Sequence, residues 1–490
     1  MATKPRVRVR ARTGADGRSI IEGFRPVASF EAAQSGRRSQ DMWSSANVAG
    51  PITEVAGALE ILRRRSRWEI QNNGAAHRAV AVRASAAVGA GILPAIRNDD
   101  LRVLFFKWAL ECDALNRDSF WTLQRLVAME MDKGGEIFGR FRPRKTTDGL
   151  TVPLQVQLLP GEFVPLAGMG LPQDAVSGIQ FDGIGRPRTY WMYNRHPGET
   201  AGTQAQPQLL PIPADEVLHA YFTEEIGQVR GIPALVRAIV PLHDLHDYID
   251  AELVKKKTGA LFGIVVETTS TAQTAVLDGS DPTAPAEVNV WIPPRDPGAL
   301  NYAPAGVKIP TVNPPTAVGG DFEVFMRSQY QRVSMAAGMP YELLTGDFRN
   351  VNDRLFRSVQ LWYERDIQPR QEIIIQDFCR PVLSRFIDAA VAAGVWRGSE
   401  DEIAEAKESE WRVQPFGHVH PVQEAQADIM LIGAGLKTRS QAVQERGRSF
   451  PDVLAELAAE QKAIEAAGVS LSFDPRAMLE AAVETEKSDG

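Results

Sequence analysis

Residues 231–259 read GIPALVRAIVPLHDLHDYIDAELVKKKTG, and their apolar spacing predicts one long amphipathic helix. Pro233 near its first turn and Gly259 just after its last turn are typical start and stop signals. Pro241 lies inside the pattern and predicts a kink. A single apolar stripe runs along the predicted helix through Leu235, Ile239, Leu242, Leu245, Ile249 and Leu253.

Three consecutive lysines, Lys255, Lys256 and Lys257, fill the last turn of this predicted helix. They complement the negative end of the helix dipole, which explains them without any ligand. The same lysines would place positive charge near phosphate groups if the helix lined a channel. Both interpretations stay open from these residues alone.

A second amphipathic helix is predicted over residues 321–337, where Gly338 and Pro340 end it. A polar connection follows at 345–354, and a long helix is then predicted as far as Gly394, with bends at Pro369 and Pro381. One face of the second amphipathic helix carries Phe322, Met326, Tyr330, Val333 and Ala337.

The segment between the two amphipathic helices, residues 260–319, differs in kind from both. A β-like run at 261–266 leads into a polar stretch that is followed by repeated prolines. Because proline interrupts helices and central strands alike, we expect a small projecting β module here. The prolines are Pro293, Pro294, Pro297, Pro304, Pro310, Pro314 and Pro315.

Residues 51–230 contain both helix-like and strand-like spacings of apolar side chains. A helical spacing begins at Pro51, and a long apolar stretch at 105–131 predicts another helix. Residues 151–158 alternate apolar and polar side chains as a half-buried strand does, and a turn at 182–187 precedes a strand at 189–193. The predicted fold class is therefore α+β, mainly α-helical.

Four arginines, Arg63, Arg64, Arg65 and Arg67, lie close together at the end of the first helical pattern. They could contact phosphate groups, but a solvated helix face is the favoured interpretation of such a charge run.

The two ends of the chain are polar. Residues 1–50 predict a flexible basic arm, which either stays solvated or becomes ordered on a partner. From about residue 420 the chain is predicted to be helical and charged, and its tail after residue 484 is acidic.

The overall composition narrows the class of protein. The 490 residues include 54 basic and 61 acidic side chains, which gives a net charge of −7. This balance argues against a protein that holds nucleic acid through net positive charge alone. The most apolar stretch, 79–96, is interrupted by Arg83 and Pro94, so we expect no membrane span. Two cysteines and an N-terminus without a signal-peptide pattern fit a reducing cytosol.

Motifs for catalysis are missing from the sequence. Residues 433–438 (GAGLKT) superficially resemble a phosphate-binding loop, but their spacing does not match the motif. His243, His246 and Asp247 share one predicted helix and could ligate a metal, which leaves a metal-dependent hydrolase as a less favoured alternative. We therefore expect no catalytic residue, no metal site and no cofactor, and a structural rather than an enzymatic protein.

A series of short motifs, in the same order along the chain, resembles the lambda-type portal proteins of tailed bacteriophages. The motifs are residues 65–73 (RSRWEIQNN), 88–92 (VGAGI), 178–182 (GIQFD), 216–219 (EVLH), 228–233 (QVRGIP), 338–347 (GMPYELLTGD) and 433–436 (GAGL). No single motif is specific, but the ordered series extends over roughly residues 50–465. One departure follows the last long motif: where the family usually shows Asn-Tyr-Ser-Ser, this chain has Asn352-Asp353-Arg354-Leu355.

The resemblance implies the portal fold of wing, stem, clip and crown, which assembles as a dodecameric ring at one capsid vertex. Its parts would be a basic arm at 1–50, a wing at 51–230, a first stem helix at 231–258, a clip at 259–320, a second stem helix at 321–338, a tunnel loop at 339–354, a long wing helix at 355–398, and a crown with a C-terminal tail at 399–490.

The resemblance also implies a function. The ring would form the channel through which double-stranded DNA is packaged and ejected. Its partners would be the terminase large subunit, the major capsid and scaffold proteins, and the head–tail connector protein. The protein would belong to the virion and be assembled in the host cytoplasm. A connector or baseplate protein without DNA contact remains the alternative.

The DNA-facing residues are implied by the same resemblance. They would be the tunnel-loop residues Asp347, Phe348, Arg349, Asn350, Val351, Asn352, Asp353 and Arg354, and the stem lysines Lys255, Lys256 and Lys257 would line the channel. A ring of chains with net charge −7 repels DNA overall, so a few local arginine contacts would centre the duplex without trapping it.

Overall fold

The computed structural model describes residues 50–199, 206–260, 265–267, 301–303, 319–349, 351–414, 421–448 and 450–468, together with two short strands near the N-terminus. The chain divides into two compact units, Met1–Gly50 and Pro51–Gly490. In the first unit, β1 (Arg12–Thr13) pairs antiparallel with β2 (Ser19–Ile20). The rest of the predicted basic arm lies outside the described residues, as does the acidic tail.

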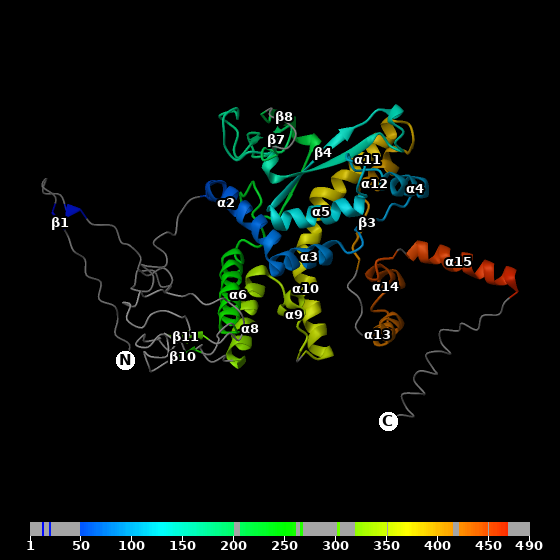
Figure 1. Cartoon of the computed structure of the whole chain (residues 1–490). Helices are drawn as coiled ribbons and strands as arrows, with labels where there is room; N and C mark the ends of the chain where they lie inside the picture. Colours follow the sequence, from blue (N-terminus) through cyan, green and yellow to red (C-terminus); the bar gives the residue numbers. More distant parts are fainter. Residues whose placement is uncertain are drawn as a thin grey trace, which may run out of the picture. The chain divides into compact units, whose positions relative to one another are not determined.

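The N-terminal part of the second unit is helical (Figure 1). It contains α2 (Pro51–Asn72), α3 (Gly74–Val88), α4 (Asp99–Trp108) and α5 (Phe120–Lys133). The single helix predicted over 105–131 was therefore wrong. The carboxylate of Asp113 accepts hydrogen bonds from two backbone N–H groups of the intervening turn, and Ser119 then caps the start of α5.

Two antiparallel three-stranded sheets follow, with strand orders β5-β4-β9 and β6-β7-β8. The hairpin predicted around 182–187 is confirmed, because β6 and β7 pair across this turn and the Asp182 carboxylate accepts bonds from the N–H groups of Ile184 and Arg186. The strands are β4 (Glu136–Pro143), β5 (Leu154–Pro160), β6 (Ile179–Phe181), β7 (Pro187–Tyr193), β8 (Leu209–Pro213) and β9 (Val217–Tyr221).

One long helix leads away from this body, and a second leads back to it. The first, α6 (Ile239–Ala260), begins later than predicted, because residues 234–238 form turns. Pro241 consequently lies in the first turn of α6, where it needs no intrahelical N–H partner, and the predicted kink was wrong. The second helix, α8 (Gly319–Ala337), agrees with the prediction. Between them, β10 (Val265–Glu267) and β11 (Asn301–Ala303) pair in parallel. Residues 259–260 and 319–320 of the predicted clip belong to α6 and α8, and the remaining clip residues lie outside the described residues.

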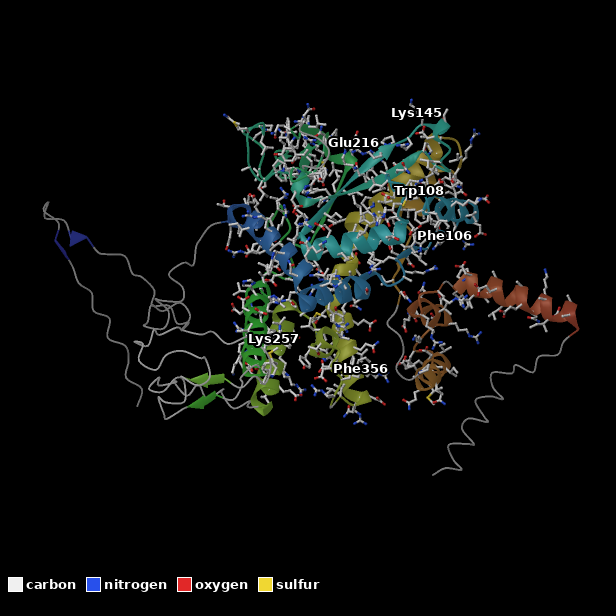
Figure 2. The ribbon with its side chains drawn as sticks, viewed as in Figure 1. Phe106, Trp108, Lys145, Glu216, Lys257 and Phe356 are labelled. Atoms are coloured by element: carbon white, nitrogen blue, oxygen red, sulfur yellow. The ribbon has the colours of Figure 1, made fainter. Side chains whose placement is uncertain are left out.

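The longest helical run crosses the body. After the short α9 (Tyr341–Thr345) come α10 (Asp353–Ile374), a π-helical segment (Ile375–Cys379) and α11 (Arg380–Ala392). The main hydrophobic core packs this run against α3, α4, α5 and the β5-β4-β9 sheet. This core contains an aromatic cluster in which the ring centroids of Trp108, labelled in Figure 2, and Phe386 lie 4.9 Å apart. Phe105, Phe120 and Phe378 complete the cluster.

The C-terminal part is helical, as predicted. It contains α12 (Glu400–Lys407), α13 (Pro421–Gly433), α14 (Arg439–Glu445) and α15 (Phe450–Ala467). One short strand, β12 (Trp411–Arg412), returns to pair with β3 (Leu93–Pro94). Neither α13 nor α15 contains a buried residue within the part of the chain that the structure describes. No described helix is both long enough and apolar enough to span a membrane.

Among the described glycines, the closest neighbouring atom is found at Gly231, where the chain leaves the sheet for α6. A Cβ atom added to Gly231 would lie 2.1 Å from the carbonyl oxygen of Gly135 and 2.6 Å from the Cβ of Tyr221. We expect Gly231→Ala to lower the free energy of unfolding by at least about 2 kcal/mol in a urea titration, because a backbone carbonyl cannot move aside.

The matched control is Gly57→Ala, in the second turn of α2, where an added Cβ meets no atom within 4 Å. This change should raise the free energy of unfolding by about 0.5–1 kcal/mol through helix propensity. Equal stabilities for the two variants would contradict the close contact at Gly231.

Candidate functional site

The candidate site is the pair of helices α6 and α8 and the loop that follows α8. Towards the β10–β11 end the two helices meet through aromatic rings, with the centroid of Tyr248 4.9 Å from that of Phe325 and 6.3 Å from that of Phe322. Near the body, the helices bury Leu242, Leu245, Val333 and Ala337 in the main core. The contact side of each helix is therefore apolar, whereas most of its remaining surface is exposed.

The three lysines in the last turns of α6, Lys255–Lys257, are exposed but have different surroundings. The ammonium group of Lys255 lies 3.3 Å from the carboxylate of Glu252, and that of Lys256 lies 4.6 Å above the ring of Phe322. Lys257, near the C-terminal end of α6 in Figure 2, makes no ion pair with any described residue. The structure therefore gives two of the three lysines a local partner.

The loop after α8 is held by its own side chains. The hydroxyl of Tyr341 donates to the carboxylate of Asp347, 3.2 Å away. The guanidinium of Arg349 makes two hydrogen bonds to the same carboxylate, of 2.8 and 2.9 Å, and a third of 2.7 Å to Glu323 of α8. These bonds from Arg349 hold the pKa of Asp347 below its ordinary value. Arg349 is thus neutralised within the chain, although two thirds of its side chain is exposed.

The other loop residues have structural contacts of their own. The ring of Phe348 lies 5.6 Å from that of Phe356, which Figure 2 labels on α10. Asn352 caps α10 by accepting a bond from the N–H of Leu355. Arg354, in the first turn of α10, is exposed and makes no ion pair among the described residues. Val351 and Asp353 are the sequence neighbours of Asn352. Asn350 lies outside the described residues.

The C-terminal end of α8 is anchored by a buried arginine from α3. The guanidinium of Arg83 donates to the carbonyl oxygens of Ala337 and Gly338 and lies 3.1 Å from the carboxylate of Asp132. Arg370 of α10 makes an ion pair with the same carboxylate. Asp132 is only 1% exposed, so its two guanidinium partners compensate a charge that has no access to water.

The start of α6 is anchored by a second buried carboxylate, that of Glu136 in β4. It forms ion pairs with Arg63 and Arg230, accepts a bond of 2.8 Å from the N–H of Gly231, and lies 3.1 Å from the imidazole of His219. Burial alone would raise the pKa of Glu136, but the adjacent guanidiniums outweigh it and hold this pKa well below the ordinary value. Burial lowers the pKa of His219, so the imidazole is neutral near pH 7.

These contacts correct the interpretation of the arginine run as a solvated face. Arg63 is 4% exposed and binds Glu136, and Arg67 pairs with Glu130 and Glu162. Arg64 and Arg65 are exposed, as the sequence predicted. The run therefore divides into two inward and two outward side chains, as the helical period requires.

The metal-binding alternative finds no support in the part of the chain that the structure describes. His243 contacts Glu69 at 3.0 Å and Asp247 at 3.7 Å, but no group of three or more His, Cys, Asp or Glu residues there could hold a metal ion.

Burial raises the pKa of both free cysteines, Cys112 and Cys379, which disfavours their reactive thiolate forms.

Comparison with known proteins identifies the family. A family model described as "Phage portal protein, lambda family" matches residues 36–371, which include α6, α8 and the loop. The chain belongs to the lambda family of phage portal proteins. The resemblance inferred from its sequence motifs is therefore confirmed.

Individual relatives are distant. The chain is 23% identical over 471 residues to a protein named "Probable portal protein" from Halomonas phage phiHAP-1, covering 88% of this chain and 86% of that protein. Among solved structures, a chain in "Neck of empty GTA particle computed with C6 symmetry" has a TM-score of 0.40 at 15% identity, covering 82% of this chain and 99% of that chain. A chain in "Virion of native gene transfer agent (GTA) particle" has a TM-score of 0.39 at 14% identity, covering 80% and 93%.

Membership of the portal family assigns a structural class of protein, not an enzymatic one. The site residues that sequence reasoning missed are Asp132 and Glu136, which flank the glycine pair Gly134 and Gly135 between α5 and β4. No local signal marks them, because acidic side chains are almost never fully buried unless they are paired, and their arginine partners Arg83, Arg370 and Arg230 lie far away in the sequence.

The buried carboxylate of Glu136 makes a testable contribution to stability. We expect Glu136→Gln to lower the free energy of unfolding by about 3–5 kcal/mol at pH 7, because two buried guanidiniums lose their counter-charge. The difference from wild type should shrink as the pH falls below about 4, because the unfolded chain takes up a proton there before the folded chain does.

The measurement is urea unfolding at a series of pH values, with Glu60→Gln as the control. Glu60 is exposed on the same helix as Arg63, and its substitution should change stability by less than about 0.5 kcal/mol. If the two variants were equally stable, Glu136 would not be the charge that organises this region.

Proposed function

We propose that copies of this chain assemble into a closed dodecameric ring at one vertex of a capsid, as the resemblance to portal proteins implies. The ring forms the channel through which double-stranded DNA is packaged and ejected. The observation that carries the proposal is the family match, which extends over both long helices and the loop after them. In this proposal the ring belongs to the virion, is assembled in the host cytoplasm, and contacts the major capsid and scaffold proteins. It also docks the terminase large subunit and the head–tail connector protein, and the chain itself catalyses no reaction.

The parts of the fold take the roles that the family resemblance implies. Residues 51–230 and 355–398 would form the wing, α6 and α8 the stem, and 259–320 the clip that meets the terminase and later the connector. The helices α13 to α15 would belong to the crown. The apolar contact between α6 and α8, beside largely exposed outer faces, suits a stem wall that meets water in a channel.

The loop at 339–354 would approach the DNA. Its arginines would not act alike, because Arg349 is already paired with Asp347 and Glu323, whereas Arg354 makes no ion pair among the described residues. We therefore assign the main phosphate contact of the loop to Arg354. One weak contact per copy suits a duplex that must slide, since each neutralised phosphate adds affinity.

Electron microscopy of the purified full-length chain tests the ring. We expect closed rings with a central opening under assembly conditions, because the outward faces of the stem helices carry exposed apolar side chains. A chain that stays monomeric at all concentrations and salts would contradict the proposal.

The role of Arg354 is tested by the salt dependence of duplex binding to assembled rings. We expect Arg354→Ala to weaken binding and to reduce the slope of log K against log salt by about one for each guanidinium that contacts a phosphate. The control is Arg117→Ala, which removes the same charge from a side chain that is 81% exposed on the wing and should leave the slope unchanged. Identical slopes for both variants would exclude Arg354 from the DNA contact.

A further inference from the structure

A groove lies between the first turns of α2 and the segment that leads from β9 to α6. It has a volume of about 320 Å³, and its lining residues come from 51–62 and 224–237. We propose that this groove binds a short segment of a partner protein in which apolar side chains are flanked by lysine or arginine. The inference does not depend on the proposed ring, because one copy of the chain supplies every residue of the lining.

The floor of the groove is apolar. Leu59 and Val55 of α2 are 0% and 9% exposed, and Ile232 and Val236 on the opposite side are half-buried. An apolar cavity of about 150 Å³ accepts a benzene-sized group, so this groove has room for about two bulky apolar side chains. Pockets for small molecules have volumes of about 300–1,000 Å³, and a value at the lower end favours the side chains of a peptide over a larger ligand.

One wall of the groove is a turn that is held by its own hydrogen bonds. The side-chain amide oxygen of Gln228 accepts bonds of 2.9 and 3.3 Å from the N–H groups of Glu224 and Glu225. The amide nitrogen of Gln228 donates a bond of 2.7 Å to the carbonyl oxygen of Arg230. Since Gln228 is buried, the turn is fixed from the inside, and a partner would meet a preformed wall.

The same turn exposes an isoleucine at the edge of the groove. Ile226 is 100% exposed and stands between Glu225, which lines the groove, and Gly227. Gly227 has a φ of 88°, and a Cβ atom added to it would lie 3.9 Å from the Cγ of Pro51, so the turn reaches the first residue of α2. Ile226 therefore adds apolar surface that a bound segment would cover.

The rim of the groove carries negative charge that the chain does not compensate. Glu54 on α2 and Glu225 on the turn are exposed and form no ion pair among the described residues. The other two charged side chains of the lining neutralise each other, because the guanidinium of Arg237 donates hydrogen bonds of 3.0 and 2.7 Å to the carboxylate of Glu224. An occupant that complements this rim carries basic side chains beside its apolar ones.

A polypeptide segment combines these two properties in a few residues. Lysine or arginine next to leucine, phenylalanine or tryptophan supplies an apolar anchor for the floor and a positive charge for the rim. Apolar grooves on other proteins take up such segments as a helix or as an extended chain.

Binding of a synthetic peptide to the purified full-length chain tests the groove. The probe is a short fluorescein-labelled peptide in which leucine and tryptophan are flanked on both sides by lysine. We expect Glu225→Lys to weaken its binding by about tenfold in fluorescence anisotropy, because a like charge then faces the lysines of the probe. Ala58→Trp should weaken binding at least as much without a change of charge, because the added indole ring fills the groove that Ala58 lines.

The matched control is Glu60→Lys, which makes the same change of net charge at an exposed position of α2 outside the lining. Its affinity should stay within about twofold of wild type at physiological salt, because charges away from the bound peptide are screened. Two further peptides, one with glutamate in place of lysine and one with serine in place of leucine and tryptophan, should each bind about tenfold more weakly than the probe. Thermal unfolding confirms that each variant is folded.

A second measurement uses the wild-type chain alone. The tryptophan of the probe is replaced by a photoreactive benzoylphenylalanine, and the labelled residues are located by mass spectrometry. We expect the crosslinks to fall within 51–62 and 224–237, the two segments that line the groove.

Equal affinities of Glu225→Lys and Glu60→Lys, crosslinks outside the two segments, or no binding of the probe to the wild-type chain would each overturn the peptide site. Binding to the single chain but not to its assemblies would assign the groove to a second copy and would overturn it as well. None of these results bears on the ring, which microscopy tests separately. A chain that binds the probe but forms no ring would contradict the proposed function and leave this inference in place.

Discussion

The carboxylate of Glu136 is surrounded by two guanidiniums, an imidazole and a backbone N–H, and it has no access to solvent. A buried charge of this kind is tolerated only if every partner is in place. Its partners come from α2, from β9 and from the residues that lead into α6, and Arg63 and Arg230 lie 73 and 94 residues away along the chain. The path of the chain out of the sheet therefore depends on this one side chain.

Asp132 has the matching role where the chain returns to the body at the end of α8. It fixes Arg83, which in turn binds the last carbonyl oxygens of α8. Asp132 and Glu136 lie on either side of the turn between α5 and β4, so the entry to α6 and the exit from α8 are tied to the same few residues. The start of α6 and the end of α8 are thus fixed to the body by ion pairs rather than by apolar packing alone.

Much of the fold was predictable because its signals are local. The apolar stripe and stop residues of α8, the hairpin at 182–187 and the helical C-terminal part all follow from spacing within a short window. The start of α6 was not predictable, since Gly231 and Ala234 donate their N–H groups to Glu136 and Asp132, far away in sequence. For the same reason Arg63 was expected in solvent but is buried. The pairing of Arg349 with Glu323 was likewise not predicted. The family was recognisable because ordered motifs do not depend on knowing which distant residues meet.

The π-helical segment between α10 and α11 has a consequence for how this chain can vary in length. A π turn holds one residue more than an α turn does. Removing one residue from Ile375–Cys379 would turn this wide turn into an ordinary α turn and leave α11 close to its present rotation relative to α10. Phe386 would still face Trp108, and the aromatic cluster would be kept. A one-residue deletion in a regular turn of α10 would instead rotate everything after it by about 100°. The π-helical segment is therefore a point at which this helical run can change its length by one residue without disturbing the core.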